Sequence, residues 1–126
     1  MFIKIIVVSL QNKGKQITNK MEKKTILLTE DFLNWEWWGY KGMVSLFIYM
    51  LFKANTEDSE EFGQKVGRGS LLISVGNLCG KVNLTSAEVR LRLTKLEETN
   101  HITIKTSNRY TIITVCDYED YVIEEV

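Results

Sequence analysis

The chain has 126 residues, of which 44% are hydrophobic and 25% are charged, with 16 basic and 16 acidic side chains. This length favours a single domain, and the apolar share excludes an intrinsically disordered chain. The two cysteines, Cys79 and Cys116, lie far apart, and only one histidine is present, so we expect no metal site and no cofactor. Unpaired cysteines of this kind fit a reducing, cytoplasmic setting.

The zero net charge conceals a segregation of charge along the chain. Residues 64–116 carry 8 basic and 3 acidic residues, whereas residues 25–63 carry 2 basic and 7 acidic ones. Residues 1–24 are basic, and residues 117–126 carry five acidic residues and no basic one. The local field matters more for nucleic-acid binding than the net charge does. Residues 64–116 are therefore a candidate nucleic-acid contact, the alternative being ordinary solvated surface.

Residues 1–20 form an N-terminal extension ahead of the predicted domain. The apolar run Phe2–Leu10 is too short to span a bilayer and lacks the charged start and cleavage site of a signal peptide. Gln11–Lys20 is polar and predicts a loop. Our hypothesis is that translation starts at Met21, which the intact mass of natively expressed protein would decide. The alternative is an added edge strand at Phe2–Leu10 with a basic arm.

Two helices are predicted before the acidic middle of the chain. Thr29 is a possible N-cap for a short helix over Thr29–Trp38, whose three tryptophans we expect to pack as core and lid. Met43–Phe52 is apolar nearly all round but only half the length of a membrane span, so it predicts a buried helix of a soluble protein. Any apolar surface of Met43–Phe52 that the chain leaves uncovered could form a homodimer.

A surface loop, a strand and a helix are predicted next. Asn55–Gln64 is acidic and marked by glycine, which predicts the loop, and Leu71–Ser74 predicts a short strand. The apolar residues of the following helix recur with helical spacing at Val75, Leu78, Cys79 and Val82. Cys79 falls on the apolar face of this helix, where a buried thiol is the simplest interpretation.

A second helix follows after a joint of only a few residues. Thr85 is a good N-cap, and Glu88, three residues later, completes the pattern of a capping box. The apolar positions Val89, Leu93 and Leu96 define one inward face, and Asn100 is a plausible stop signal. Two helices joined this tightly predict a helix-turn-helix.

Two alternating runs then predict a β-hairpin. Ile102 and Ile104 alternate with Thr103 and Lys105, Ile113 and Val115 alternate with Ile112 and Thr114, and Ser107–Arg109 separates the runs. With the strand at residues 71–74, the hairpin would form a small antiparallel sheet. The expected fold is α+β, a winged helix-turn-helix with a three-helix core, over residues 25–121. Residues 122–126 would be an acidic tail.

The order of these features resembles the N-terminal DNA-binding domains of phage replisome organisers and DnaD-type primosome proteins, from bacteria and mobile elements. The similarity covers about residues 26–121, and the first matching sequence segments are Trp35–Trp38, Leu51–Asn55 and Arg68-Gly69. They continue with Leu78, Leu84-Thr85, Val89-Arg90, Leu93, Leu96-Glu97, Ile102, Tyr110–Val115, Tyr118 and Tyr121. The resemblance implies a winged helix that binds double-stranded DNA, in replication initiation or transcription control. Such replication proteins usually continue into a second helical domain, so full initiator activity is not expected of this chain.

Eight residues are the candidate DNA contacts: Ser86, Ala87, Arg90, Leu91, Thr94, Lys95, Lys105 and Arg109. Arg90 could pair with a guanine, whereas Ser86 and the basic residues of the helix end and hairpin would contact phosphates. Leu91 offers only apolar contact, and Glu98 would repel phosphate. Arg92 lies at the edge of the inward face, where it could pair with Glu88.

A second class of function stays open, in which exposed Leu91 and the Met43–Phe52 surface bind a protein partner. We expect no enzyme, no small-molecule substrate and no membrane association. His101 has no matched nucleophile and is expected to be exposed at a strand edge. The carboxylates Asp117, Glu119 and Asp120 lack acid–base or metal-ligand spacing, so a solvated tail is expected there.

Overall fold

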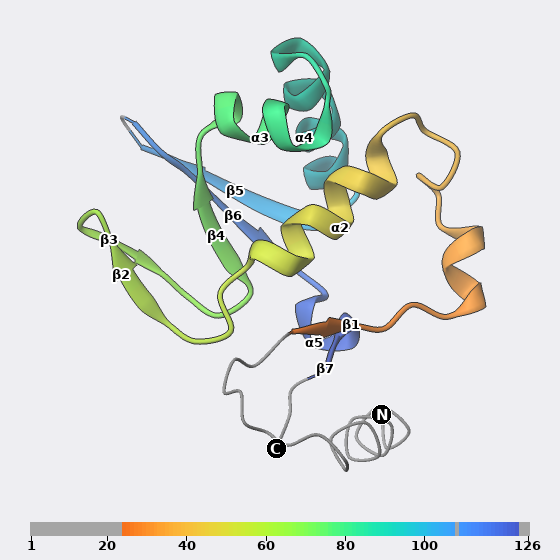
Figure 1. The fold of residues 1–126 in the computed structure, drawn as a ribbon, viewed down its shortest axis with the longest axis horizontal. Coiled ribbons are helices and arrows are strands. Elements are labelled where there is room, and N and C mark those ends of the chain that lie inside the picture. Colours follow the sequence, from red (N-terminus) through yellow and green to blue (C-terminus); the bar gives the residue numbers. More distant parts are fainter. Residues whose placement is uncertain (1–23, 108, 124–126) are drawn as a thin grey trace.

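The computed structural model describes residues 24–107 and 109–123 (Figure 1), which form a mixed α+β fold of helices and small antiparallel sheets. The predicted extension over residues 1–20, the alternative start at Met21 and the end of the acidic tail lie outside the described residues. In chain order the elements are β1 (Thr25–Ile26), the 3₁₀ helix η1 (Glu30–Asn34), α2 (Met43–Lys53), β2 (Ser59–Glu61), β3 (Gln64–Val66), β4 (Ser70–Ile73), α3 (Val75–Val82), α4 (Ser86–Glu98), β5 (Ile102–Thr106), β6 (Thr111–Val115), α5 (Tyr118–Tyr121) and β7 (Val122–Ile123).

The predicted hairpin and its third strand are confirmed. β6 is the middle strand of a sheet in the order β4–β6–β5, and both neighbours run antiparallel to it. Leu71 lies opposite Ile113 on one side, and Ile104 lies opposite Ile113 on the other. Alternation places Ile102, Ile113 and Leu71 in the core.

The two helices predicted before the hairpin are also confirmed, and the predicted stop signal Asn100 follows the end of α4 with a positive φ of 65°. Asn83 ends α3 in the left-handed conformation, with φ 57°. At the start of α4 the Glu88 amide donates to Thr85 Oγ1 at 3.1 Å, and the Thr85 amide donates to Glu88 Oε1 at 2.9 Å. This reciprocal capping box fixes the first turn of α4 immediately after the joint.

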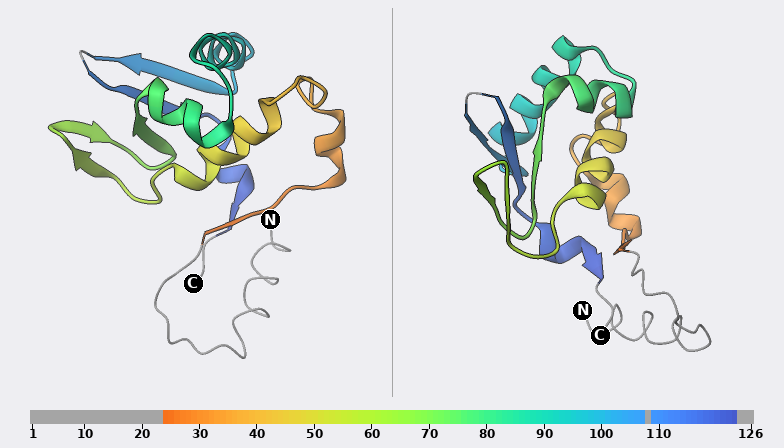
Figure 2. Two further views of the ribbon diagram at one scale, coloured as in Figure 1. Left: turned by 45° about the horizontal axis from the view of Figure 1, so that its top comes forward. Right: turned by 60° about the vertical axis from the view of Figure 1, so that its left-hand side comes forward.

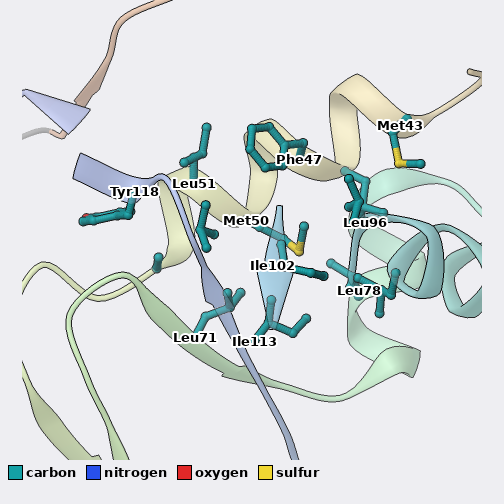
Figure 3. Close-up of a cluster of buried hydrophobic side chains, with 14 of the residues drawn as sticks. Met43, Phe47, Met50, Leu51, Leu71, Leu78, Leu96, Ile102, Ile113 and Tyr118 are labelled. Atoms are coloured by element: carbon teal, nitrogen blue, oxygen red, sulfur yellow. The ribbon is translucent and has the colours of Figure 1, made fainter. Parts of the chain in front are cut away.

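Helix α2 lies against the sheet, beside the α3–α4 pair (Figures 1 and 2). Five of its side chains are essentially inaccessible to solvent, namely Met43, Leu46, Phe47, Met50 and Leu51. Figure 3 shows members of this row directed toward residues of the sheet and of α3 and α4. These are the side chains that suggested a dimer surface, and the chain itself covers them, leaving Phe52 as the exposed large apolar residue of α2.

The turn into α2 depends on close packing at Gly42. This residue caps α2 with a left-handed φ of 76°. A Cβ atom on Gly42 would lie 2.9 Å from Leu84 Cδ2 in the joint between α3 and α4. Glycine therefore serves both the backbone conformation and the approach of α2 to that joint.

The tryptophan segment is less helical than its sequence predicts. Only Glu30–Asn34 is helical, as a 3₁₀ helix, although Thr29 caps it as expected by accepting a hydrogen bond from the Asp31 amide. Trp35 then adopts an extended backbone, and its ring packs on Phe47 of α2. The predicted helix over Thr29–Trp38 is wrong beyond Asn34 because core packing of Trp35 overrides local helix propensity.

The acidic segment Asn55–Gln64 is not the irregular loop that we expected. It includes β2 and the start of β3, joined by the two residues Phe62 and Gly63, which both have positive φ, 51° and 77°. Positive φ at both positions is the geometry of a type I′ turn. The Asn55 side chain secures the base of this hairpin, with Nδ2 donating to Ser59 Oγ, Glu61 Oε2 and the Val66 carbonyl.

The ordered chain continues two residues beyond the predicted domain end at 121. Val122 and Ile123 are buried and form β7, which pairs with β1. Tyr118 of α5 is buried and Tyr121 packs against the core. Lys24, which precedes β1, donates to the carbonyls of Leu51, Phe52 and Ala54, so that the two ends of the described chain secure the C-terminus of α2.

Replacement of Thr85 by alanine should lower the free energy of unfolding by about 1 kcal/mol, because the Glu88 amide in the first turn of α4 loses its side-chain acceptor. Urea denaturation measures this change. Thr94→Ala is the control: Thr94 is exposed within α4, and its loss should change stability by less than about 0.5 kcal/mol. Equal effects of the two substitutions would contradict a specific role of the cap.

Candidate nucleic-acid interface

The exposed side of α4 carries five of the eight candidate DNA contacts. Ser86 and Ala87 lie in its first turn, and Arg90, Leu91 and Thr94 follow, all five being exposed. Val89, Leu93 and Leu96 are buried, so the predicted division of this helix into inner and outer sides is confirmed. The outer side is thus available for a partner.

Lys95 lies on the flank of α4 and not on its outer side. It is half-buried, and its Nζ lies 5.8 Å from the ring centre of Trp37 and 5.7 Å from that of Tyr40. Both contacts have the geometry of a cation–π interaction. The aromatic segment before α2 therefore holds this ammonium group beside the helix.

The other two candidate contacts lie on the β5–β6 hairpin. Lys105 is exposed in β5, and Arg109 is exposed in the connection to β6. Figure 2 shows the hairpin extending away from α4, with the β2–β3 hairpin projecting toward the same side of the molecule. The eight residues accordingly occupy two neighbouring elements, a helix and an extended hairpin.

Three exposed cations, one on α4 and two on the β5–β6 hairpin, differ from Arg68 in their contacts. Arg68 forms a bidentate pair with Glu119, with distances of 2.6 and 2.8 Å. By contrast, the side chains of Arg90, Lys105 and Arg109 make no hydrogen bond or ion pair within residues 24–107 and 109–123. Their charges face solvent and are not neutralised by the fold.

Acidic residues on α4 make the charge of its exposed side differ between the N-terminal and the C-terminal half. Glu98 is exposed in the last turn, and Glu97 accepts a hydrogen bond from the Ile104 amide at 3.1 Å. Glu88 is engaged at the opposite end, where the hydrogen bond from the Thr85 amide lowers the pKa of its carboxyl group. The outer side is therefore more positive toward its N-terminus, around Arg90.

Arg92 has a structural position and does not contribute to this exposed side. Its side chain is buried, with Nε donating to the Lys41 carbonyl at 2.7 Å and Nη1 to the Glu88 carbonyl at 3.1 Å. The guanidinium carbon lies 4.8 Å from the ring centre of Tyr40. The pairing predicted with Glu88 thus involves its backbone oxygen, since its carboxylate serves the capping box.

The sequence interpretation missed two features near these elements. The rings of Phe62 and Tyr110 stack with centroids 5.1 Å apart, so the tip of the β2–β3 hairpin contacts the β5–β6 hairpin. His101 is not exposed as expected: Nε2 lies 2.8 Å from Glu36 Oε2 and 3.3 Å from Trp35 Nε1. The glycine after Phe62 signals the turn, but no local pattern indicates the partners of His101.

Within the part of the chain that the structure describes, no three His, Cys, Asp or Glu side chains are grouped to hold a metal ion, and no helix is long and apolar enough to cross a membrane. No protein-family model matches the chain, and no curated protein or solved structure is significantly similar to it. The functional argument therefore depends on the geometry of α4 and the hairpin.

Substitution of Arg92 by alanine should lower the free energy of unfolding by about 1.5–3 kcal/mol, because two carbonyls lose a charged donor. Urea denaturation again measures the change. Arg90→Ala removes the same side chain from an exposed position two residues away and should cost less than about 0.5 kcal/mol. A comparable loss in both variants would show that Arg92 does not secure the Lys41 segment.

Proposed function

We propose that this chain is a winged-helix protein that binds duplex DNA through α4 and the β5–β6 hairpin. The order of a short helix, a tight joint, a second helix and a hairpin is that of a winged helix-turn-helix. The observation that carries the proposal is the exposure of Arg90, Lys105 and Arg109 on those elements, without a hydrogen bond or ion pair to any other residue that the structure describes. Such cations can replace the counterions of DNA phosphates.

In the proposed complex the N-terminal half of α4 enters the major groove. Recognition helices contact base edges mainly through their N-terminal residues, which places Arg90 near bases and Glu98 away from them. Arg90 can donate two hydrogen bonds to a guanine, and the Leu91 side chain can contact a thymine methyl group. Lys105 and Arg109 would contact phosphates and set the position of the hairpin.

For the biological role, we propose replication initiation or transcription control in a prophage or another mobile element, in the bacterial cytoplasm. Support comes from the resemblance of residues 26–121 to phage replisome organisers and DnaD-type proteins. The α2 side chains that could have formed a homodimer are covered within the chain, so one copy can present the proposed surface by itself.

A second candidate function is protein binding through the same helix. Leu91 is 48% exposed in the middle of α4, which is a position where an apolar side chain is of more use to a protein partner than to a phosphate backbone. On this alternative Leu91→Ala would abolish partner binding, whereas Arg90→Ala would have little effect.

The test is fluorescence anisotropy of labelled duplexes, one random and one from the region upstream of the coding sequence, over a salt series. Affinity should fall with salt by about 0.9 in log–log slope for each phosphate contacted. Arg90→Ala should cost about 1–3 kcal/mol on the preferred duplex and reduce discrimination between duplexes. Lys105→Ala and Arg109→Ala should each weaken binding to both duplexes equally and lower the salt slope by about 1.

Lys53→Ala is the matched control, because it removes an exposed positive charge from α2, outside α4 and the hairpin. It should leave affinity and salt slope near those of the unmodified chain. Equal duplex binding by the unmodified chain and by the Arg90, Lys105 and Arg109 triple variant would contradict the proposed mode. Absence of binding at low salt would favour the protein-binding alternative.

A further inference from the structure

A small aromatic cavity lies between η1 and α5, in a part of the molecule separate from α4. Its volume is about 230 Å³, and its walls include the rings of Phe32, Trp35 and Tyr121. Two carboxylates, Asp31 and Asp120, also line it. None of the described lining residues is positively charged. The cavity therefore combines aromatic surfaces with a negative charge.

The aromatic walls are held in place by the core. Phe32 stacks on Trp35 with centroids 4.9 Å apart and an interplanar angle of 20°. Trp35 packs on Phe47 of α2 and donates from Nε1 to His101 Nε2. Tyr121 meets Phe32 edge-on at 6.4 Å and also contacts Phe47. These rings are fixed before any ligand arrives, which lowers the entropic cost of binding.

The charge around the cavity favours a cation. Asp31 is exposed in the first turn of η1, next to Glu30. Asp117 and Asp120 belong to the acidic α5 segment, and together with burial they raise the pKa of the Tyr121 hydroxyl, so this group remains neutral near pH 7. A positive group in the cavity could pair with Asp31 while its apolar part contacts the rings.

The size of the cavity limits the ligand to a single side chain. Sites for drug-sized molecules and cofactors typically measure about 300–1,000 Å³, which exceeds this volume. Two leucines that are adjacent in sequence to lining residues, Leu28 and Leu33, are 38% and 51% exposed, so the same segment also presents apolar side chains to solvent. A side chain that belongs to a protein segment fits both features better than a free ion does.

We propose that this cavity binds an arginine side chain of a partner protein, with apolar residues of the partner on Leu28 and Leu33. A guanidinium group is planar, so it can stack on aromatic faces and form two parallel hydrogen bonds to one carboxylate. Lysine can provide only a point charge. This site is distinct from the proposed DNA contact. Both can be occupied in one molecule, because the cavity lies between η1 and α5 and the DNA contact lies on α4 and the β5–β6 hairpin.

The test is a titration of the ¹⁵N-labelled full chain, followed by NMR, with the peptide acetyl-Leu-Arg-Leu-amide. The indole N–H of Trp35 and the amides of Phe32 and Tyr121 should shift saturably. The same peptide with citrulline in place of arginine has nearly the same shape without the charge. Its affinity should be at least fivefold lower, and that of the lysine peptide should be intermediate.

Two variants distinguish binding in the cavity from non-specific attraction of the peptide to an acidic surface. Asp31→Asn should weaken the arginine peptide at least fivefold, whereas Glu30→Gln, which changes the neighbouring carboxylate outside the lining, should not. An unchanged spectrum outside residues 27–35 would show that both variants fold. Equal affinity for arginine and citrulline, shifts confined to other elements, or no binding of the arginine peptide would each overturn the proposal, whatever the result with DNA.

Discussion

Burial of α2 is the constraint on which the other elements depend. Its buried side chains, Met43, Leu46, Phe47, Met50 and Leu51, are covered by the sheet and by the α3–α4 pair (Figure 3). Trp35 of the tryptophan segment adds to that cover by packing on Phe47. A helix that is apolar on more than one side is stable in water only when several elements pack on it. The close approach of Gly42 to Leu84 then brings the N-terminus of α2 into contact with the joint between α3 and α4.

Polar contacts at the edge of this core determine which side chains of α4 remain exposed. Arg92 binds the Lys41 carbonyl, and Trp37 donates from Nε1 to Thr99 Oγ1, so the segment before α2 is secured to the middle and to the C-terminal end of α4. These contacts use the inner and flanking positions of α4 and leave Arg90 and Leu91 on its outer side. The same segment supplies Trp35 to the aromatic cavity. The proposed DNA contact and the proposed arginine site are thus supported by one set of packed rings.

Most of the fold could be predicted from local patterns, and most of what was missed depends on contacts between distant residues. Capping at Thr85, helical spacing through Leu96 and strand alternation are all local, and they correctly placed α3, α4, β5 and β6. The environment of His101 depends on Glu36 and Trp35, 65 and 66 residues away, which no local pattern encodes. The β2–β3 turn was missed because Phe62 is an unusual residue for positive φ, although Gly63 marks it. Of the candidate site, exposure along α4 was predictable, whereas the aromatic contacts of Lys95 and the arginine cavity were not.

The central claim is that α4 and the β5–β6 hairpin form one surface for duplex DNA. The most direct measurement is an NMR map of backbone amide shifts in the ¹⁵N-labelled full chain on addition of duplex, at low and at moderate salt. The account predicts salt-sensitive shifts concentrated from Ser86 to Thr94 and around Lys105 and Arg109, with little change in η1. Shifts concentrated in η1, or an unchanged spectrum at low salt, would contradict it.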